Sequence, residues 1–171
     1  MLANTGTKTV ILLVFSIAFI TILSLFALSL FSKTLTAPIT SYAKTDVQKP
    51  KAELPVTFID TGTSKVNDIV TRDYVVKNVG DKPLQLSGIN SSCDCTSAKI
   101  ISGNKETKEA GMGKRSSEVV EVAPGTEVTI RVIYRPFVMP VYGVVFREVY
   151  VNTNDPNLSK MILRIKANII K

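Results

Sequence analysis

The sequence has no histidine and no tryptophan, and it contains only two cysteines in 171 residues. Without histidine the chain cannot build a Ser-His-Asp triad, a Cys-His pair, a His-based zinc site or a C-x-x-C-H haem attachment. No glycine-rich phosphate-binding loop follows an apolar strand pattern. The sequence therefore predicts a protein that is not an enzyme and has no cofactor, and a small-molecule substrate is not expected.

The sequence also lacks a large excess of either positive or negative residues. The chain has 21 Lys and Arg against 14 Asp and Glu, which gives a net charge of +7. An excess of this size, spread along the chain, is typical of a solvated surface near an anionic membrane or an acidic partner, and it gives no argument for nucleic acid. We expect no nucleic-acid partner.

What the sequence does contain is one long uncharged stretch, residues 9–32, between Lys8 and Lys33. A helix of these 24 residues is about 36 Å long, enough to cross a hydrocarbon core of roughly 30 Å. A cleavable signal has a shorter apolar core, about 7 to 15 residues, that ends at a small-residue cleavage site. Here the nearest candidate, Ala37, precedes Pro38. We therefore predict a short tail over residues 1–8 and an uncleaved transmembrane helix over residues 9–32, with membrane lipid as its partner.

Residues 33–54 are polar and carry Pro38 and Pro50, without a period of 2 or 3.6. This composition predicts a linker between the helix and the rest of the chain. Fully extended, such a segment would reach about 70 Å.

From residue 55 to residue 171 the pattern changes to short alternating apolar runs separated by turn residues. The two clearest runs are residues 128–135 and 161–169. Weaker runs cover residues 56–59, 69–77, 84–89, 118–122 and 144–152. About seven strands without an amphipathic helix predict an all-β domain, an antiparallel β-sandwich of two sheets.

Two segments in this region are typical of reversals between strands. Asn78-Val79-Gly80-Asp81 offers residues that tolerate a positive φ. Asn154-Asp155-Pro156-Asn157 combines a fixed proline φ with side chains that can bond the turn backbone. Both are interpreted as turns with a structural role.

Several of these segments, taken in order, resemble a known family. The motifs are Asn78-Val79-Gly80, Pro83-Leu84-Gln85-Leu86, Ser92-Cys93-Asp94-Cys95-Thr96, Pro124-Gly125 and Val151-Asn152-Thr153-Asn154-Asp155-Pro156. Their order resembles the bacterial extracytoplasmic immunoglobulin-like proteins of domain-of-unknown-function family 1573. The resemblance implies an Ig-like sandwich exported across a bacterial inner membrane, and it brings no established activity. Two departures from the family pattern are a longer polar insertion over residues 99–117 and a full apolar span in place of a signal or lipid anchor.

The lysines that flank the apolar run do not settle its orientation. Lys8 precedes the run, whereas Lys33, Lys44 and Lys49 follow it, which mildly favours the opposite topology. Long domains are exported largely regardless of flanking charge. We therefore infer the orientation from the type of domain, which resembles exported domains. We expect the N-terminus in the cytoplasm and the C-terminal domain in the periplasm.

Cys93-Asp94-Cys95 is the one constellation that could carry chemistry. In an extended strand two such Cα atoms lie about 6.6 Å apart, near the upper limit for a disulfide. We favour a structural role, either a disulfide or packed thiols. Two alternatives remain open: a thiolate clamp for Cu(I) with Met112 or Met139 as a third ligand, and redox exchange, which the neighbouring Asp94 disfavours.

Two further segments are candidate contact surfaces. The insertion over residues 99–117 is expected to be a flexible, mildly basic loop, with Lys105, Lys108, Lys114 and Arg115 as contacts for lipid phosphate or an acidic partner. The connection Phe137-Val138-Met139-Pro140-Val141-Tyr142 is unusually apolar. Those of its side chains that stay exposed together would form a protein-docking patch, and the candidates are Phe137, Val138, Met139, Val141 and Tyr142.

Together these features predict a non-catalytic, membrane-anchored Ig-like module that serves as an accessory subunit of a larger bacterial membrane complex. The alternatives are a thiol-based copper or redox protein of the periplasm and a free-standing envelope or adhesion module.

Overall fold

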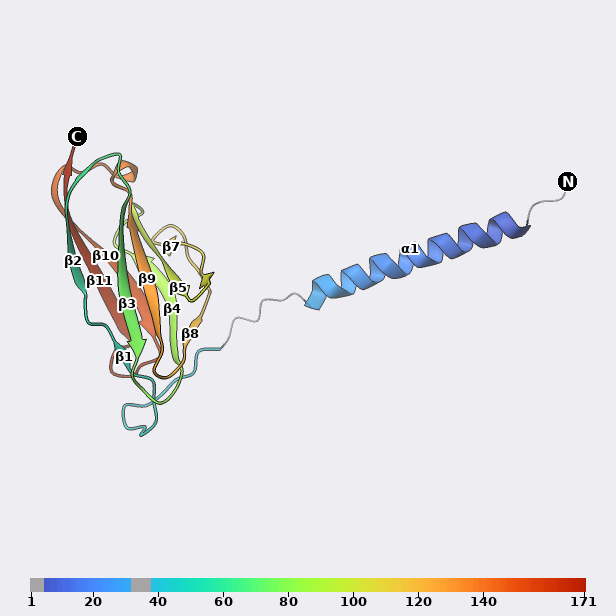
Figure 1. The fold of residues 1–171 in the computed structure, drawn as a ribbon, viewed down its shortest axis with the longest axis horizontal. Coiled ribbons are helices and arrows are strands. Elements are labelled where there is room, and N and C mark those ends of the chain that lie inside the picture. The colour runs from blue at the N-terminus through green and yellow to red at the C-terminus, as the bar shows by residue number, and fades with distance from the viewer. Residues whose placement is uncertain (1–4, 32–37) are drawn as a thin grey trace. The chain divides into compact units, whose positions relative to one another are not determined.

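The computed structural model describes the backbone of residues 5–31 and 38–171, and the side chains of residues 11–24 and 38–171. The chain divides into two compact units, residues 1–35 and residues 36–171. The first contains one helix, α1 (Thr5–Phe31) (Figure 1).

No helix within the described residues is both long enough and apolar enough to cross a membrane. Part of the predicted span over residues 9–32 lies outside the residues whose side chains are described, as do residues 1–4 of the predicted tail. The transmembrane helix therefore stays a prediction.

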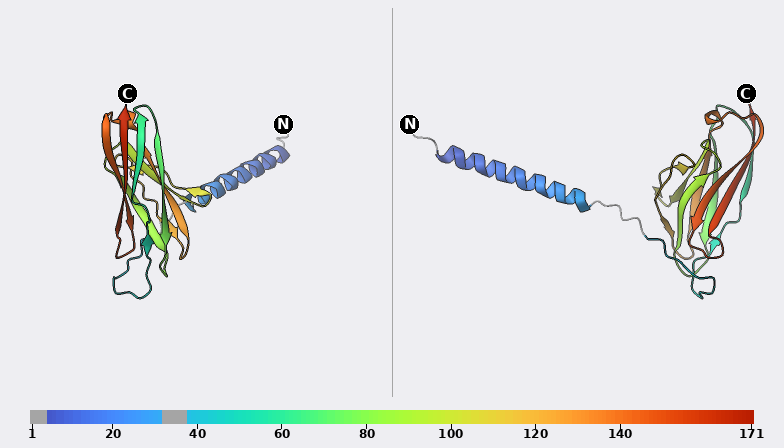
Figure 2. Two further views of the ribbon diagram at one scale, coloured as in Figure 1. Left: turned by 60° about the vertical axis from the view of Figure 1, so that its left-hand side comes forward. Right: turned by 180° about the vertical axis from the view of Figure 1, so that it is seen from behind.

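The second unit is a sandwich of two sheets (Figure 1 and Figure 2). One sheet has the order β1-β3-β9-β5-β6, with β7 also paired to β5, and the other has the order β2-β11-β10-β4-β8. The strands are β1 (Ala52–Glu53), β2 (Phe58–Lys65), β3 (Val70–Asn78), β4 (Leu84–Ser91), β5 (Thr96–Ser102), β6 (Lys105–Glu106), β7 (Ala110–Gly111), β8 (Val120–Val122), β9 (Glu127–Tyr134), β10 (Gly143–Thr153) and β11 (Lys160–Ile170). A 3-10 helix, η1 (Pro136–Val138), follows β9.

The all-β prediction is confirmed, and two of its details are wrong. The sheets are not wholly antiparallel, because β2 runs parallel to β11. Eleven strands are present in the described residues where about seven were expected. The alternation criterion missed β5 because Thr96, Ser97 and Ala98 are buried in succession, and β1, β6 and β7 are too short to show a period.

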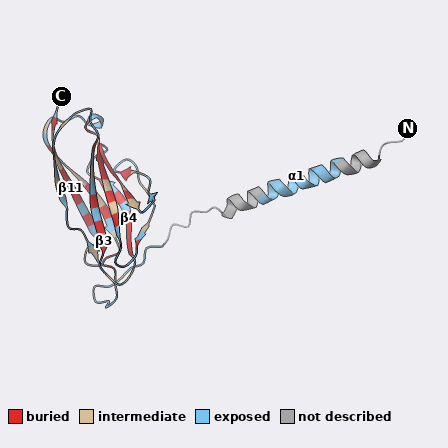
Figure 3. Cartoon of the chain, viewed as in Figure 1, coloured by how far each residue is buried: buried red, intermediate tan, exposed pale blue. Residues whose placement is uncertain are grey.

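The core lies between the two sheets and is formed by every second residue of the long strands (Figure 3). β11 shows this most clearly, since Met161, Leu163, Ile165, Ala167 and Ile169 are all buried. Burying one such large side chain stabilises the fold by about 1.5–3 kcal/mol. Tyr74 crosses this core, and its hydroxyl donates a hydrogen bond of 2.6 Å to the carbonyl oxygen of Arg164 in the other sheet.

Asn78 and Gly80 lie in a reversal of the chain, as predicted. Neither residue has a positive φ, so tolerance of that conformation is not the reason for these residues. The fully buried Asn78 side chain instead donates to the carbonyls of Lys82 and Val122 and accepts the amide of Gly80. Glycine is needed at position 80 because a Cβ atom would lie 2.4 Å from the carbonyl oxygen of Lys49. The motif therefore serves close packing of the chain.

The segment predicted as a linker over residues 33–54 is partly folded onto the sandwich. Gln85 of β4 accepts the amide of Thr40 at 2.8 Å and donates to the carbonyl of Pro38 at 3.2 Å. The carboxylate of Asp155 accepts the amide of Ala52 at 2.9 Å, and β1 then pairs with β3. We call residues 38–51 the strap. The folded unit thus begins before the predicted boundary at residue 55.

Candidate functional site

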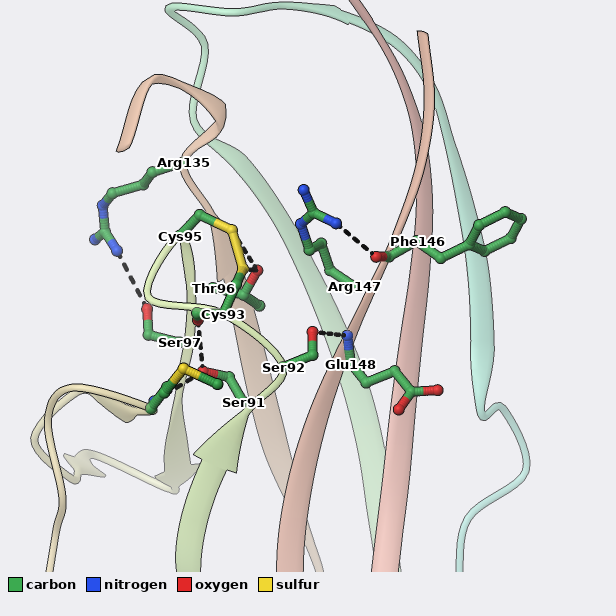
Figure 4. The surroundings of a disulfide bond; sticks show 11 residues. Ser91, Ser92, Cys93, Cys95, Thr96, Ser97, Arg135, Phe146, Arg147 and Glu148 are labelled. Atoms are coloured by element: carbon green, nitrogen blue, oxygen red, sulfur yellow. Dashed lines mark hydrogen bonds between the residues drawn. A yellow bond between two sulfur atoms is a disulfide. The ribbon is translucent and has the colours of Figure 1, made fainter. Parts of the chain in front are cut away.

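Cys93 and Cys95 form a disulfide in the turn between β4 and β5 (Figure 4). The amide of Thr96 donates to the carbonyl of Cys93 at 3.2 Å, so the segment is a β-turn and not the extended strand assumed from the sequence. This bend brings the two Cα atoms to 5.2 Å, within the usual range for a disulfide. Because a disulfide sulfur carries no proton, the hydroxyl of Thr96 is the donor to Cys93 Sγ at 3.3 Å.

Both cysteines are largely shielded from solvent, with exposures of 9% for Cys93 and 1% for Cys95. Paired in this way, the sulfurs offer no thiolate to a soft metal ion. No group of three or more metal-ligating His, Cys, Asp or Glu side chains comes together in the described part of the chain. A Cu(I) clamp would therefore require prior reduction of the disulfide.

Parts of the insertion over residues 99–117 are strands that pair with the sheet, which corrects the expectation that all of it is a loop. Its first residues belong to β5, β6 pairs back onto that strand, and β7 pairs with Ser97 and Ala98. The four predicted contact residues Lys105, Lys108, Lys114 and Arg115 are all exposed. No ligand or partner tests them, and their contact role stays a prediction.

Three side chains that the sequence did not single out hold the insertion on the sheet. Arg135 donates to both carboxylate oxygens of Glu109, at 2.6 and 3.0 Å, and Ser97 donates to the same carboxylate (Figure 4 shows Arg135 and Ser97). The guanidinium lowers the pKa of Glu109, and the carboxylate in turn raises the pKa of Arg135. No sequence signal pairs these residues, since Glu109 and Arg135 are 26 positions apart.

A pocket of about 260 Å³ lies between the disulfide turn and the insertion. Its lining includes carboxylates, cationic side chains and apolar atoms, so the pocket does not indicate one chemical class of ligand. The lining residues are Asp94, Thr96, Ser97, Glu109, Gly111, Met112, Gly113, Lys114 and Arg135.

The apolar connection after β9 remains exposed. Its five predicted contact residues, Phe137, Val138, Met139, Val141 and Tyr142, are 43–52% exposed. Val144 and Phe146, which follow in β10, are exposed as well, at 58% and 57%. We call residues 137–146 the apolar segment. The apolar pattern predicts a strand over residues 144–152, but it does not indicate that Val144 and Phe146 are exposed.

The apolar segment and the strap lie at opposite ends of the sandwich. β3 runs from Val70, which pairs with Tyr134 next to the apolar segment, to Asn78, which pairs with Ala52 next to the strap. The chain therefore enters the domain at one end and presents exposed apolar side chains at the other.

Comparison with solved structures gives matches to the fold. A protein of unknown function from Porphyromonas gingivalis W83 is 21% identical, with a TM-score of 0.56, over 74% of this chain and 50% of that chain. The chain thus spans half the length of that protein. PapD-like domain 7 of human CEP192 is 10% identical, with a TM-score of 0.44, over 79% of this chain and 97% of that domain.

No curated protein matches the chain. The model of one protein family, described as a protein of unknown function (DUF1573), matches residues 52–169. The match begins at β1 and ends at the last buried position of β11, so it covers the sandwich without the helix or the strap. The chain belongs to this DUF1573 family.

Proposed function

We propose that the chain is a non-catalytic, single-pass anchored module of a bacterial inner membrane whose periplasmic sandwich docks a partner protein through the apolar segment. The partner is an extramembrane domain, with an apolar surface of its own, of a larger membrane complex. In that complex this chain serves as an accessory subunit.

The apolar segment is the observation that carries this proposal. Seven large apolar side chains are exposed within ten consecutive residues, each by 43% or more. Single exposed apolar residues are ordinary on protein surfaces, whereas a contiguous group of this kind is typical of an interaction site. Aromatic and methionine side chains, here Phe137, Tyr142, Phe146 and Met139, are enriched at the centres of protein interfaces.

The length of chain before the sandwich supports a partner in the same membrane. The strap is bonded to the domain, so only six residues, 32–37, separate α1 from the first described residue of the strap. Such a segment spans at most about 25 Å. A short tether of this kind gives a high effective concentration, because binding of a neighbouring protein becomes nearly intramolecular. A modest apolar surface is then sufficient for stable docking.

Co-purification from gently solubilised native membranes tests the proposal. Wild type is expected to retain a partner, and Phe137→Ser or Val141→Ser is expected to lose it while the sandwich stays folded. Phe58→Ser and Val75→Ser are matched controls, because these side chains are similarly exposed, at 47% and 42%, but lie outside the apolar segment. These controls are expected to retain the partner.

Other outcomes would contradict the proposal. A wild-type protein recovered only as a monomer, without a cross-linked partner, would remove the accessory-subunit role. Recovery only with further copies of itself would make the apolar segment a self-association surface. Binding of the isolated protein to lipid vesicles, abolished by Val141→Ser, would make lipid the occupant.

A further inference from the structure

Arg147 occupies a position of β10 that faces the core. Val145 and Val149, two residues before and after it, are buried, and its partner in β11 is the buried Ile165. Because successive side chains of a strand point to opposite faces, the side chain of Arg147 enters the space between the two sheets. A charged side chain is rarely placed there unless a group of opposite charge accompanies it.

The guanidinium of Arg147 lies against Tyr134 of the other sheet. Its Cζ atom is 5.4 Å from the centre of the Tyr134 ring, within the range of a cation–π contact. Tyr134 is fully buried and is the last residue of β9. Figure 4 shows the guanidinium pointing along β10 toward the end at which this strand begins. Because β10 begins within the apolar segment, the charged tip points toward the proposed docking surface.

The hydrogen bonds of this side chain are incomplete. A guanidinium carries five N–H donors. Among the described residues its only hydrogen bond is the one that Nη1 donates to the carbonyl oxygen of Phe146, at 2.9 Å. Its Nε atom is buried without an acceptor, and the hydroxyl of Tyr134 is also buried without a partner. Because proteins satisfy nearly all of their buried polar groups, the described chain alone leaves this site unfinished.

The charge of Arg147 is also uncompensated. Three other arginines of the sandwich each pair with a carboxylate, namely Arg131 with Asp73, Arg135 with Glu109 and Arg164 with Glu148. None of the ion pairs formed by the described residues involves Arg147. A carboxylate is the anionic group that a protein partner can offer, and it matches the planar guanidinium with two parallel hydrogen bonds.

We propose that Arg147 receives the carboxylate of an aspartate or glutamate of the partner protein that docks on the apolar segment. This inference rests on the proposed function and names one chemical feature of that partner. Arg147 is partly exposed, whereas its Nε atom is covered, so the carboxylate binds the two Nη atoms at the tip. Nη1 keeps its bond to Phe146, because each Nη atom carries two hydrogens.

The apolar contacts and the charged contact have different effects on binding. Burial of the apolar side chains gives affinity for any partner with a suitable apolar surface. Arg147 discriminates between such partners, because a protein without the acidic side chain would leave the guanidinium desolvated and unpaired. The ion pair thus makes docking specific.

Carbodiimide coupling in native membranes tests this inference. Arg147→Lys places a primary amine at the site, and a water-soluble carbodiimide joins that amine to a contacting carboxylate as an amide. We expect mass spectrometry to find position 147 joined to an aspartate or glutamate of another protein. Arg131→Lys is the matched control, because Arg131 pairs with Asp73 of the same chain. Position 131 is expected to be joined to Asp73 and to no other protein.

A second variant measures what the charge contributes to binding. Arg147→Gln is expected to lower the amount of co-purified partner at least about tenfold, whereas Arg131→Gln is expected to retain the wild-type amount. Circular dichroism shows whether each variant is folded. If the variants at position 147 do not fold, wild type is treated with phenylglyoxal, which modifies arginine. Arg147 is then expected to be protected in the complex and to react once the partner is removed, while the exposed Arg115 reacts in both states.

The outcomes separate this inference from the proposed function. A wild-type protein that retains no partner would contradict the proposed function itself. A retained partner without a product from position 147, or one that Arg147→Gln retains in full, would overturn the inference and leave docking through the apolar segment in place. Equal reaction of Arg147 with phenylglyoxal in both states would do the same. If Arg147→Gln instead abolishes binding to phosphatidylglycerol vesicles, the ligand is a lipid phosphate and the inference is wrong.

Discussion

Arg135, directly after β9, donates to both carboxylate oxygens of Glu109, at 2.6 and 3.0 Å, and so joins the insertion to the sheet beside the disulfide turn. Both side chains are less than one-third exposed. A bidentate pair in this setting is stronger than an ordinary surface ion pair.

Glu109→Gln is expected to lower the free energy of unfolding by about 1 kcal/mol at pH 7. The folded-state pKa of Glu109 is lowered by Arg135. The stabilisation is therefore fully present above the ordinary pKa of a glutamate, about 4.3, and is lost as the pH falls through the lowered folded-state value. Urea unfolding of wild type and variant between pH 7 and pH 3 should show the difference shrinking toward acid.

Glu106→Gln is the control for this prediction. Its carboxylate pairs with Lys99 but is 58% exposed, and exposed pairs contribute less than about 1 kcal/mol. A constant difference between wild type and Glu109→Gln across the pH range would contradict the assigned pairing.

Tyr74→Phe is expected to destabilise the sandwich by about 1–2 kcal/mol, because the carbonyl of Arg164 loses its buried donor. Burial raises the pKa of Tyr74 to about 12. A raised folded-state pKa gives stability that is present below the unfolded value, about 10, and is lost as the pH rises toward 12. Wild type should thus lose more stability than Tyr74→Phe between pH 9 and about pH 12. Parallel loss in both proteins would show that the tyrosine is not responsible.

Gly80→Ala and Asn78→Ala are both expected to destabilise the domain and to release the strap. Alanine at position 80 would force its Cβ atom against Lys49 and Lys51. Removal of the Asn78 amide would take this donor from the buried carbonyl of Val122 and from the partly buried carbonyl of Lys82. We expect a cost of about 2 kcal/mol or more for Asn78→Ala. Asn90→Ala, on an exposed position of β4, should cost much less. Thermal unfolding gives the stabilities, and trypsin cleavage after Lys44, which is followed by Thr45, reports on release of the strap.

Alternation of apolar and polar residues was sufficient to predict the long strands β9 and β11. β11 buries one face only, and β9 does so up to Arg131, before both of its faces become buried at Val132, Ile133 and Tyr134. Alternation failed for β5, which is buried on both faces at Thr96, Ser97 and Ala98. The parallel pairing of β2 with β11 also carried no sequence signal, since partner choice depends on contacts far apart in the chain.

The candidate site was predictable to a similar degree. The cysteine pair and the apolar connection could be identified from residue type alone. No local pattern indicates the turn that brings the cysteines together. The Arg135–Glu109 pair depends on how the insertion folds back onto β5, which no local pattern indicates either. Residues 38–52 were predicted as part of a linker because their composition does not reveal the bonds that Pro38 and Thr40 make to Gln85, or the bond from Ala52 to Asp155.

Site-specific photo-crosslinking in intact cells tests docking through the apolar segment most directly. A photoreactive amino acid replaces Val141 in one protein and Val75, which is similarly exposed on β3, in another. We expect a discrete cross-linked product with another membrane protein from position 141 and none from position 75. Absence of a product at position 141, or the same product from both positions, would contradict the account.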